Sequence, residues 1–177
     1  MALVADPDAI SSVLDLCTGG GSLAIFAALS FPNAEVDGTD LSAEALSLAA
    51  ENVADHGLDD RVHLFQGDLF EAVGGRTYDL IITNPPYVGR EVMEMLPAEF
   101  RHEPVMALAG GEDGFDIVRR ILAEAADHLN PGGGLLCEIG TDRELLEAEY
   151  PDTPFLWLDT EGSEGEVFWL TREQLPS

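Results

Sequence analysis

The sequence predicts a Rossmann-like α/β fold, with a mostly parallel seven-stranded sheet, helices on both faces and an antiparallel hairpin at its C-terminal edge. Three observations lead to this prediction. Apolar runs of strand length alternate with helical patterns along most of the chain. A glycine-rich loop joins the first run to the first helix, and a short polar stretch separates the last two runs. The 177 residues suit one domain, so we expect a single unit over 1–177.

The strands are predicted from seven runs that are apolar and bounded by turn residues. They cover residues 12–17, 34–40, 62–65, 78–83, 135–139, 155–158 and 166–170. Ligands of such sheets bind beyond the carboxyl ends of the strands. The residues at those ends are Cys17, Asp40, Gln66 and Asn84, and we expect them along one rim.

Helical patterns fill the intervals between the strands. The first helix follows the glycine loop, and its expected buried face contains Leu23, Phe26, Ala27 and Leu29. The second runs from its N-cap, Ser42, to a stop at Gly57. Two more helices are predicted over 114–129 and 143–150, whereas residues 88–111 show no clear period.

The loop after the first strand reads Asp-Leu-Cys-Thr-Gly-Gly-Gly over residues 15–21. Glycines permit positive φ and let a ligand touch the backbone. Asp40 ends the second strand, 21 residues after Gly19, where a carboxylate can accept both hydroxyls of a ribose. The pattern Gly19-x-Gly21-x-x-Ala24 also satisfies a relaxed dinucleotide fingerprint, so an NAD enzyme is one candidate. Asp15 favours a different cofactor, because its carboxylate would repel a pyrophosphate and suits an ammonium and a sulfonium.

A second acidic segment, Gln-Gly-Asp-Leu-Phe, follows the third strand at residues 66–70. Asp68 could accept the amino group of an adenine, and the apolar side chains beside it could contact the ring. The alternative is that Asp68 caps a helix.

The fourth predicted strand opens into Asn84-Pro85-Pro86-Tyr87. Proline fixes φ and donates no backbone hydrogen bond, so two in a row hold the Asn84 amide and the flanking carbonyls in one stiff arrangement. Such a group can accept both hydrogens of a planar –NH2 substrate, and the aromatic ring can cover that plane. The alternative is a strand terminator, because Asn-Pro commonly starts a turn.

Composition limits the classes of partner. The net charge is −26, from 34 acidic residues and eight basic ones, all of them arginine. Such a surface repels phosphate backbones and attracts basic partners, so no nucleic-acid binding is expected; alternatively, the charge only serves solvation. No apolar run is long enough to span a bilayer, and no secretion signal or metal-ligand spacing stands out. Cys17 and Cys137 are expected to be reduced thiols in a cytoplasmic protein.

Taken together, the glycine loop, Asp40, the Asp68-Leu69 pair and the tetrapeptide resemble S-adenosylmethionine-dependent class I methyltransferases that act on planar nitrogens. The segments 96–104, 114–122 and 150–158 narrow this to a resemblance to the HemK-type protein-glutamine methyltransferases. Within that group the chain looks more like the branch that acts on a large-subunit ribosomal protein than like the branch that acts on release factors. The family's helical N-terminal domain is expected to be absent, because the chain begins almost at the first strand.

The resemblance implies roles for individual residues. The implied contacts of S-adenosylmethionine are Asp15, Cys17, Thr18, Gly19, Gly21, Asp40, Leu41, Asp68, Leu69 and Asn84. The implied catalytic residues are Asn84, Pro85 and Tyr87. The implied substrate contacts are Asn84, Pro85, Pro86, Tyr87, Arg101 and Glu103. For Arg101 and Glu103 the alternative is a surface ion pair.

Several other functions share parts of this pattern. Release-factor glutamine methylation uses the same chemistry on another basic protein of the translation machinery. A nucleic-acid amino methyltransferase shares the tetrapeptide, but it would need cations to hold the phosphate backbone. A non-catalytic partner-binding domain would bind the cofactor without transferring a methyl group. No metal is implied by any of the readings that involve S-adenosylmethionine.

Overall fold

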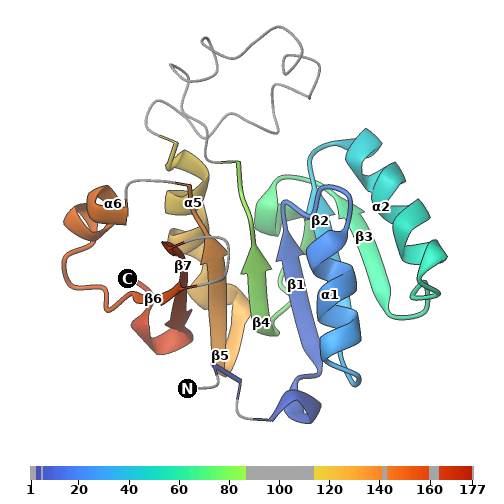
Figure 1. The fold of residues 1–177 in the computed structure, drawn as a ribbon, viewed down its shortest axis with the longest axis horizontal. Coiled ribbons are helices and arrows are strands. Elements are labelled where there is room, and N and C mark those ends of the chain that lie inside the picture. Colours follow the sequence, from blue (N-terminus) through green and yellow to red (C-terminus); the bar gives the residue numbers. More distant parts are fainter. Residues whose placement is uncertain (1–2, 5, 87–113, 141–142, 160–163, 177) are drawn as a thin grey trace, which may run out of the picture.

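The computed structural model describes residues 3–4, 6–86, 114–140, 143–159 and 164–176. A single seven-stranded sheet runs through the molecule in the order β3-β2-β1-β4-β5-β7-β6 (Figure 1). The strands are β1 Ser12–Leu16, β2 Glu35–Asp40, β3 Val62–Gln66, β4 Tyr78–Thr83, β5 Leu129–Glu138, β6 Leu156–Asp159 and β7 Glu164–Thr171. The first five pair in parallel, and β7 pairs antiparallel with both β5 and β6. The predicted fold, including its antiparallel C-terminal hairpin, is confirmed.

Helices cover both faces of the sheet. In the described part of the chain they are α1 Ser22–Ser30, α2 Ala43–Asp55, α5 Asp116–Glu124 and α6 Arg143–Glu149, together with short 3-10 turns such as η2 Leu69–Val73 and η4 Ala125–His128. One apolar core joins the sheet to α1 and α2, and the other joins it to η2, α5 and α6 (Figure 1). The hydrophobic effect on both faces therefore holds the sheet in the middle of three layers. Among the described helices, none is long and apolar enough to cross a membrane.

The predicted buried face of α1 was largely wrong. Leu23, Phe26 and Leu29 are 39%, 68% and 61% exposed, and of the four expected residues only Ala27 is buried. The side chains that face the sheet are Ala24, Ile25, Ala27 and Ala28. Three of these four are alanines, so the helix can lie close to the strands, and the larger side chains are left on the outer face. The prediction had placed Leu23, Phe26 and Leu29 on one face with Ala27, whereas the close packing of α1 selects the small residues beside them.

The long helix predicted over 114–129 is shorter than expected. α5 ends at Glu124, a 3-10 turn follows, and Leu129 already begins β5. Asn130, Pro131 and Gly132 were expected only to end the helix, but they lie within the observed strand. Tyr78 pairs with Leu129, and the register of β4 and β5 shifts between Tyr78 and Leu80, which accommodates this irregular start.

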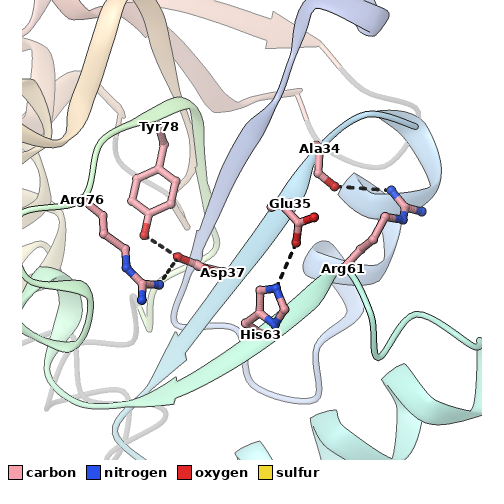
Figure 2. A network of polar contacts seen from close by, with 7 residues as sticks. All are labelled: Ala34, Glu35, Asp37, Arg61, His63, Arg76 and Tyr78. Atoms are coloured by element: carbon pink, nitrogen blue, oxygen red, sulfur yellow. Dashed lines mark hydrogen bonds and ion pairs between the residues drawn. The ribbon is translucent and has the colours of Figure 1, made fainter.

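The amino-terminal parts of the strands are joined through hydrogen-bonded carboxylates. Asp79 accepts hydrogen bonds from the amide and hydroxyl of Ser11, from the amide and hydroxyl of Ser12 and from the Asn130 side chain, at 2.8–3.2 Å. Figure 2 shows a second case, in which one oxygen of Asp37 accepts both Arg76 and the Tyr78 hydroxyl at 2.7 Å. These contacts tie the amino-terminal parts of β1, β2, β4 and β5, and the loop before β4, into one unit.

Candidate functional site

The predicted site residues converge where the parallel strands end. We call this side of the sheet, formed by the C-terminal ends of β1 to β4, the carboxyl edge. In the register, Leu16 lies opposite both Thr39 and Thr83, and Asp40 lies opposite Gln66. The segments that follow β1, β2, β3 and β4 therefore leave the sheet side by side. This adjacency brings together the glycine loop, Asp40, Asp68 and the start of the Asn84 tetrapeptide, as the sequence predicted.

The loop after β1 turns sharply through left-handed conformations. Cys17, Gly19 and Gly21 have φ values of 58°, 54° and 83°. A Cβ on Gly21 would come within 3.1 Å of the Cβ of Ala49 on α2, so glycine is needed there for space as well as for φ. Cys17 has no such freedom, and its left-handed conformation costs about 1–2 kcal/mol. Strain of this kind in a non-glycine residue is characteristic of ligand-binding turns.

Asp15 lies at the end of β1, fully buried beneath this loop. Its Oδ2 accepts a hydrogen bond from the Thr18 hydroxyl at 2.6 Å and another from the Ala24 amide at 2.9 Å. Its Oδ1 is buried and has no hydrogen-bond partner. Burial is the largest cause of a raised pKa, about 7 instead of the usual 3.8. An unsatisfied buried acceptor is costly, so this oxygen is suited to a donor that arrives with a ligand.

Asp40, at the end of β2, holds the neighbouring backbone. Its two carboxylate oxygens accept the amides of Gly19 and Ser42, each at 2.9 Å, and its own carbonyl accepts the Gly67 amide at 3.0 Å. A carboxylate oxygen has two lone pairs, so each can accept one further hydrogen bond, as the predicted ribose contact requires. Leu41 is 48% exposed beside it, in a place where it could contact a ligand.

Asp68 does not cap a helix, which settles one of the alternatives left open by the sequence. It stands at the N-cap position of η2, but its side chain makes no capping hydrogen bond. Both of its carboxylate oxygens instead accept Arg120 on α5, at 3.1 and 2.9 Å. The next residue, Leu69, is buried and has φ +47°, so the second non-glycine residue with positive φ in the described chain also lies at this edge.

The tetrapeptide directly follows β4, as the sequence predicted. Asn84 is exposed directly after β4, Pro85 is buried and Pro86 is partly buried. Asn84 follows Thr83, and the Thr83 hydroxyl donates to the Leu16 carbonyl at 2.9 Å, which places Asn84 beside the glycine loop. Tyr87, Arg101 and Glu103 lie outside the described residues. The predicted catalytic and substrate-binding roles at this edge therefore remain predictions.

The electrostatics of the site favour a cation. The pKa of the Cys17 thiol is raised to about 12, first by burial and then by the negative charges of Asp40, Asp15 and Asp68. Cys17 is therefore no nucleophile at neutral pH. The negative charges of Asp40 and of ionised Asp15 disfavour a pyrophosphate, which weakens the NAD alternative. No group of three or more potential metal ligands occurs among the residues that the structure describes.

One partner of the site was not found from the sequence. Arg120 is 52 residues from Asp68, and no local pattern connects the two. Its adjacent arginine, Arg119, binds Glu149 instead, so the sequence offered no way to tell which arginine faces the site. Thr18, predicted as a cofactor contact, was found to hold Asp15 with its hydroxyl.

Comparisons with known proteins agree with this geometry. A family model described as methyltransferase small domain matches residues 2–108. The ribosomal protein uL3 glutamine methyltransferase of Bradyrhizobium diazoefficiens is 59% identical over 174 residues, which are 98% of this chain and 54% of that protein. The protein of the same name from Bordetella pertussis is 54% identical over 172 residues, covering 97% of this chain and 58% of that protein. The chain therefore spans little more than half the length of these curated relatives.

Among solved structures, a methyltransferase from Pyrococcus furiosus superposes with a TM-score of 0.67 at 21% identity. The match covers 92% of this chain and 75% of that one. At this level of identity the likeness concerns the fold alone, and the sheet and its helices have the arrangement of that methyltransferase.

Proposed function

The chain belongs to the methyltransferase small domain family, and from this premise we propose that it transfers a methyl group from S-adenosylmethionine to the side-chain amide nitrogen of a glutamine in ribosomal protein uL3. The two relatives named as ribosomal protein uL3 glutamine methyltransferases, at 54–59% identity over nearly the whole chain, support this substrate. The observation that carries the proposal is the position of Asn84, exposed one residue beyond the Leu16–Thr83 pair and so next to the loop that covers Asp15.

The residues at the carboxyl edge suit this cofactor. The orphaned Oδ1 of Asp15 can accept the ammonium group, Asp40 the ribose hydroxyls and Asp68 the adenine amino group. The other residues proposed to line the site are Cys17, Thr18, Gly19, Gly21, Leu41 and Leu69. When bound, S-adenosylmethionine supplies an electrophilic methyl group on a positively charged sulfur. The negative charge of Asp40, and that of Asp15 when it is ionised, would stabilise such a cation.

The tetrapeptide is proposed to orient the amide nitrogen of the glutamine for methyl transfer. An amide nitrogen is a poor nucleophile, because its lone pair is delocalised into the carbonyl group. In the proposed mechanism the side-chain oxygen of Asn84 and the backbone carbonyl of Pro85 accept the two N–H groups of the glutamine and hold the nitrogen in one orientation. As positive charge develops on that nitrogen, the same acceptors bind it more strongly, so they act on the transition state more than on the ground state.

The remaining substrate contacts follow from the family resemblance. Tyr87 is proposed to pack on the glutamine amide, Pro86 to stiffen the loop, and Arg101 and Glu103 to line the glutamine pocket. The net charge of −26 would speed the approach of a basic ribosomal protein.

The test supplies the 177-residue chain and labelled S-adenosylmethionine to ribosomal proteins from cells that lack glutamine methylation. We expect label in uL3, on one glutamine, by mass spectrometry of its peptides. Asn84→Ala should lower turnover by about 100-fold or more while leaving the affinity for S-adenosylhomocysteine unchanged within about twofold. Asn33→Ala is the matched control, because Asn33 is an exposed asparagine that contacts only the Asp8 carbonyl in the described structure.

Two results would contradict the proposal. Label that enters release factors or nucleic acid, but not uL3, would reassign the substrate. Equal losses of turnover and of cofactor affinity in Asn84→Ala would show that Asn84 supports the fold and not the reaction.

A further inference from the structure

The carboxylate of Asp68 does not cap the turn that this residue begins. It occupies the N-cap position of η2, where an aspartate normally accepts the amides of the first turn, yet its side chain accepts none of them. The amide of Glu71 binds the Asp68 backbone carbonyl instead, at 3.0 Å. The carboxylate is therefore turned away from the turn that it begins.

Arg120 accounts for this orientation. Its two terminal nitrogens reach one carboxylate oxygen each, at 3.1 and 2.9 Å, so the guanidinium and the carboxylate form a bidentate pair. A bidentate pair restricts rotation of the carboxylate, whereas a lysine would act only as a point charge. Arg120 comes from α5, on which Val118, Ile121 and Leu122 are fully buried against the sheet, so the guanidinium is carried by a rigid element.

The backbone next to Asp68 is held as firmly. Leu69 is 5% exposed and has φ +47°, a conformation that a leucine keeps only where its surroundings impose it. On the other side, a Cβ on Gly67 would lie 2.8 Å from the Cβ of Ala72, so the chain passes too close to η2 for any side chain there.

The arrangement is more than a helix anchor. The side chains of Arg120 and Asp68 are 42% and 34% exposed, and ion pairs with this exposure contribute little to the stability of the fold. α5 is already fixed by its buried face. Gly67, the residue before Asp68, donates its amide to the Asp40 carbonyl at 3.0 Å, and the Asp40 carboxylate accepts the Gly19 amide at 2.9 Å, so Asp68 lies close to the glycine loop. The guanidinium uses two of the four acceptor positions of the carboxylate and leaves the others for a ligand.

We propose that Arg120 is a positioning residue, which fixes the Asp68 carboxylate so that it accepts the exocyclic amino group of the cofactor's adenine and so selects adenosyl over inosyl compounds. This inference rests on the proposed function, because it requires that the site binds the adenosyl cofactor. In an inosyl analogue the amino group is replaced by a carbonyl oxygen. This oxygen and the Asp68 carboxylate are both hydrogen-bond acceptors, so they would repel each other. A freely rotating Asp68 could turn to the neighbouring ring N–H instead, but a carboxylate clamped by Arg120 cannot.

The experiment compares the dissociation constants of S-adenosylhomocysteine and S-inosylhomocysteine by calorimetry. In the unmodified chain the inosyl compound should bind about 100-fold more weakly, because the fixed carboxylate of Asp68 is left facing another hydrogen-bond acceptor. Arg120→Met should weaken S-adenosylhomocysteine about tenfold and change the inosyl compound by less than about threefold, so that the ratio falls to about 10. Arg120→Lys should give an intermediate ratio, because it keeps the charge without the fork.

Arg76→Met is the matched control. Arg76 also pairs with an aspartate, Asp37, at 2.7 Å, but in the network of Figure 2 and away from the glycine loop. Its loss should lower the melting temperature and leave the binding ratio unchanged. In an Asp68→Ala background, Arg120→Met should have no further effect on the ratio.

The outcomes separate the two proposals. The unmodified chain could bind S-adenosylhomocysteine and methylate uL3 while folded Arg120→Met and Arg120→Lys show the same ratio of the two dissociation constants as the unmodified chain. That result would overturn the role of Arg120 and leave the proposed function intact. Should Arg120→Met fail to fold, the ratio of Arg120→Lys decides in the same way. A folded chain that binds neither compound overturns the proposed function as well.

Discussion

Two aspartates at opposite edges of the same sheet show how differently this protein uses a carboxylate. At the amino edge, Asp79 accepts five hydrogen bonds from Ser11, Ser12 and Asn130. At the carboxyl edge, Asp15 accepts two on one oxygen and none on the other. Asp79 is only partly buried, whereas Asp15 is completely buried, so the residue with the greater need for partners has fewer.

The pKa values of the two groups move in opposite directions for this reason. Desolvation alone would raise the pKa of Asp79, but the donors from Asn130 and the two serines outweigh it and hold the pKa below its usual value. For Asp15 desolvation dominates over the donors from Thr18 and Ala24, and the pKa rises to about 7. A carboxylate that stabilises the fold is thus saturated within the fold, and one left unsatisfied is available for a ligand.

The largest effect is expected for Asp15→Asn, which tests whether the unsatisfied carboxylate serves a ligand. The change removes the charge at nearly constant volume, so we expect the affinity for S-adenosylhomocysteine to fall by about 100-fold, through loss of the buried partner of its ammonium group. Stability at pH 8 should stay the same or rise, because a buried unpaired charge is removed. Calorimetric titration and thermal unfolding measure the two effects. An unchanged affinity would show that the orphaned oxygen of Asp15 does not meet the cofactor.

For Asp79→Ala we expect the opposite result, a loss of stability with little change in cofactor affinity. Five donors at the amino edge lose their acceptor, and we expect the free energy of unfolding to fall by about 2 kcal/mol. Denaturant unfolding gives this value. The affinity of the folded fraction for S-adenosylhomocysteine should stay within about twofold, because the carboxyl edge lies at the other end of the strands. A large loss of affinity would show that the two edges are coupled.

The two groups should also respond to pH with opposite signs. Asp15 has a raised pKa in the folded state, so its contribution to stability is fully present below about pH 4 and is lost as the pH rises through about 7. Asp79 has a lowered pKa, so its contribution is present above about pH 4 and is lost as the pH falls through its folded pKa.

Cofactor binding should follow the ionisation of Asp15. The ammonium group of S-adenosylhomocysteine prefers the ionised form of Asp15. The affinity for this compound should therefore rise with pH by about tenfold per pH unit and level off above about pH 7. Titrations between pH 5.5 and 8.5, for the unmodified chain and Asp15→Asn, give the slope. If the slope persists in Asp15→Asn, another group is responsible.

The smallest effect is expected in the Asp37 network. Tyr78→Phe removes one of the two donors to the Asp37 oxygen, while Arg76 remains (Figure 2). The free energy of unfolding should fall by about 1 kcal/mol, because Asp37 loses one donor and keeps Arg76 as its other partner. Thermal unfolding at pH 7 would measure it. A loss several times larger would show that Asp37 depends on Tyr78 alone.

Much of this protein could be read from its sequence, because the relevant patterns are local. The alternation of apolar runs and helical patterns predicted the parallel sheet, and the C-terminal runs predicted the antiparallel hairpin. In a parallel sheet all strands end at one edge, so the meeting of the glycine loop, Asp40, Asp68 and Asn84 followed from the topology alone. Residue type was enough to single out Asp15 as unsuited to a pyrophosphate.

What the sequence could not supply depends on packing between distant segments. The face that α1 buries was decided by how closely alanines let it approach the sheet, and not by where its largest side chains stand. The pairing of Asp68 with Arg120 joins residues 52 positions apart on different elements. The unsatisfied oxygen of Asp15 is likewise a property of the folded state, since only complete burial removes the water that would otherwise bind it. Local chemistry determined which groups the edge carries, and tertiary packing decided which of them remain open to a ligand.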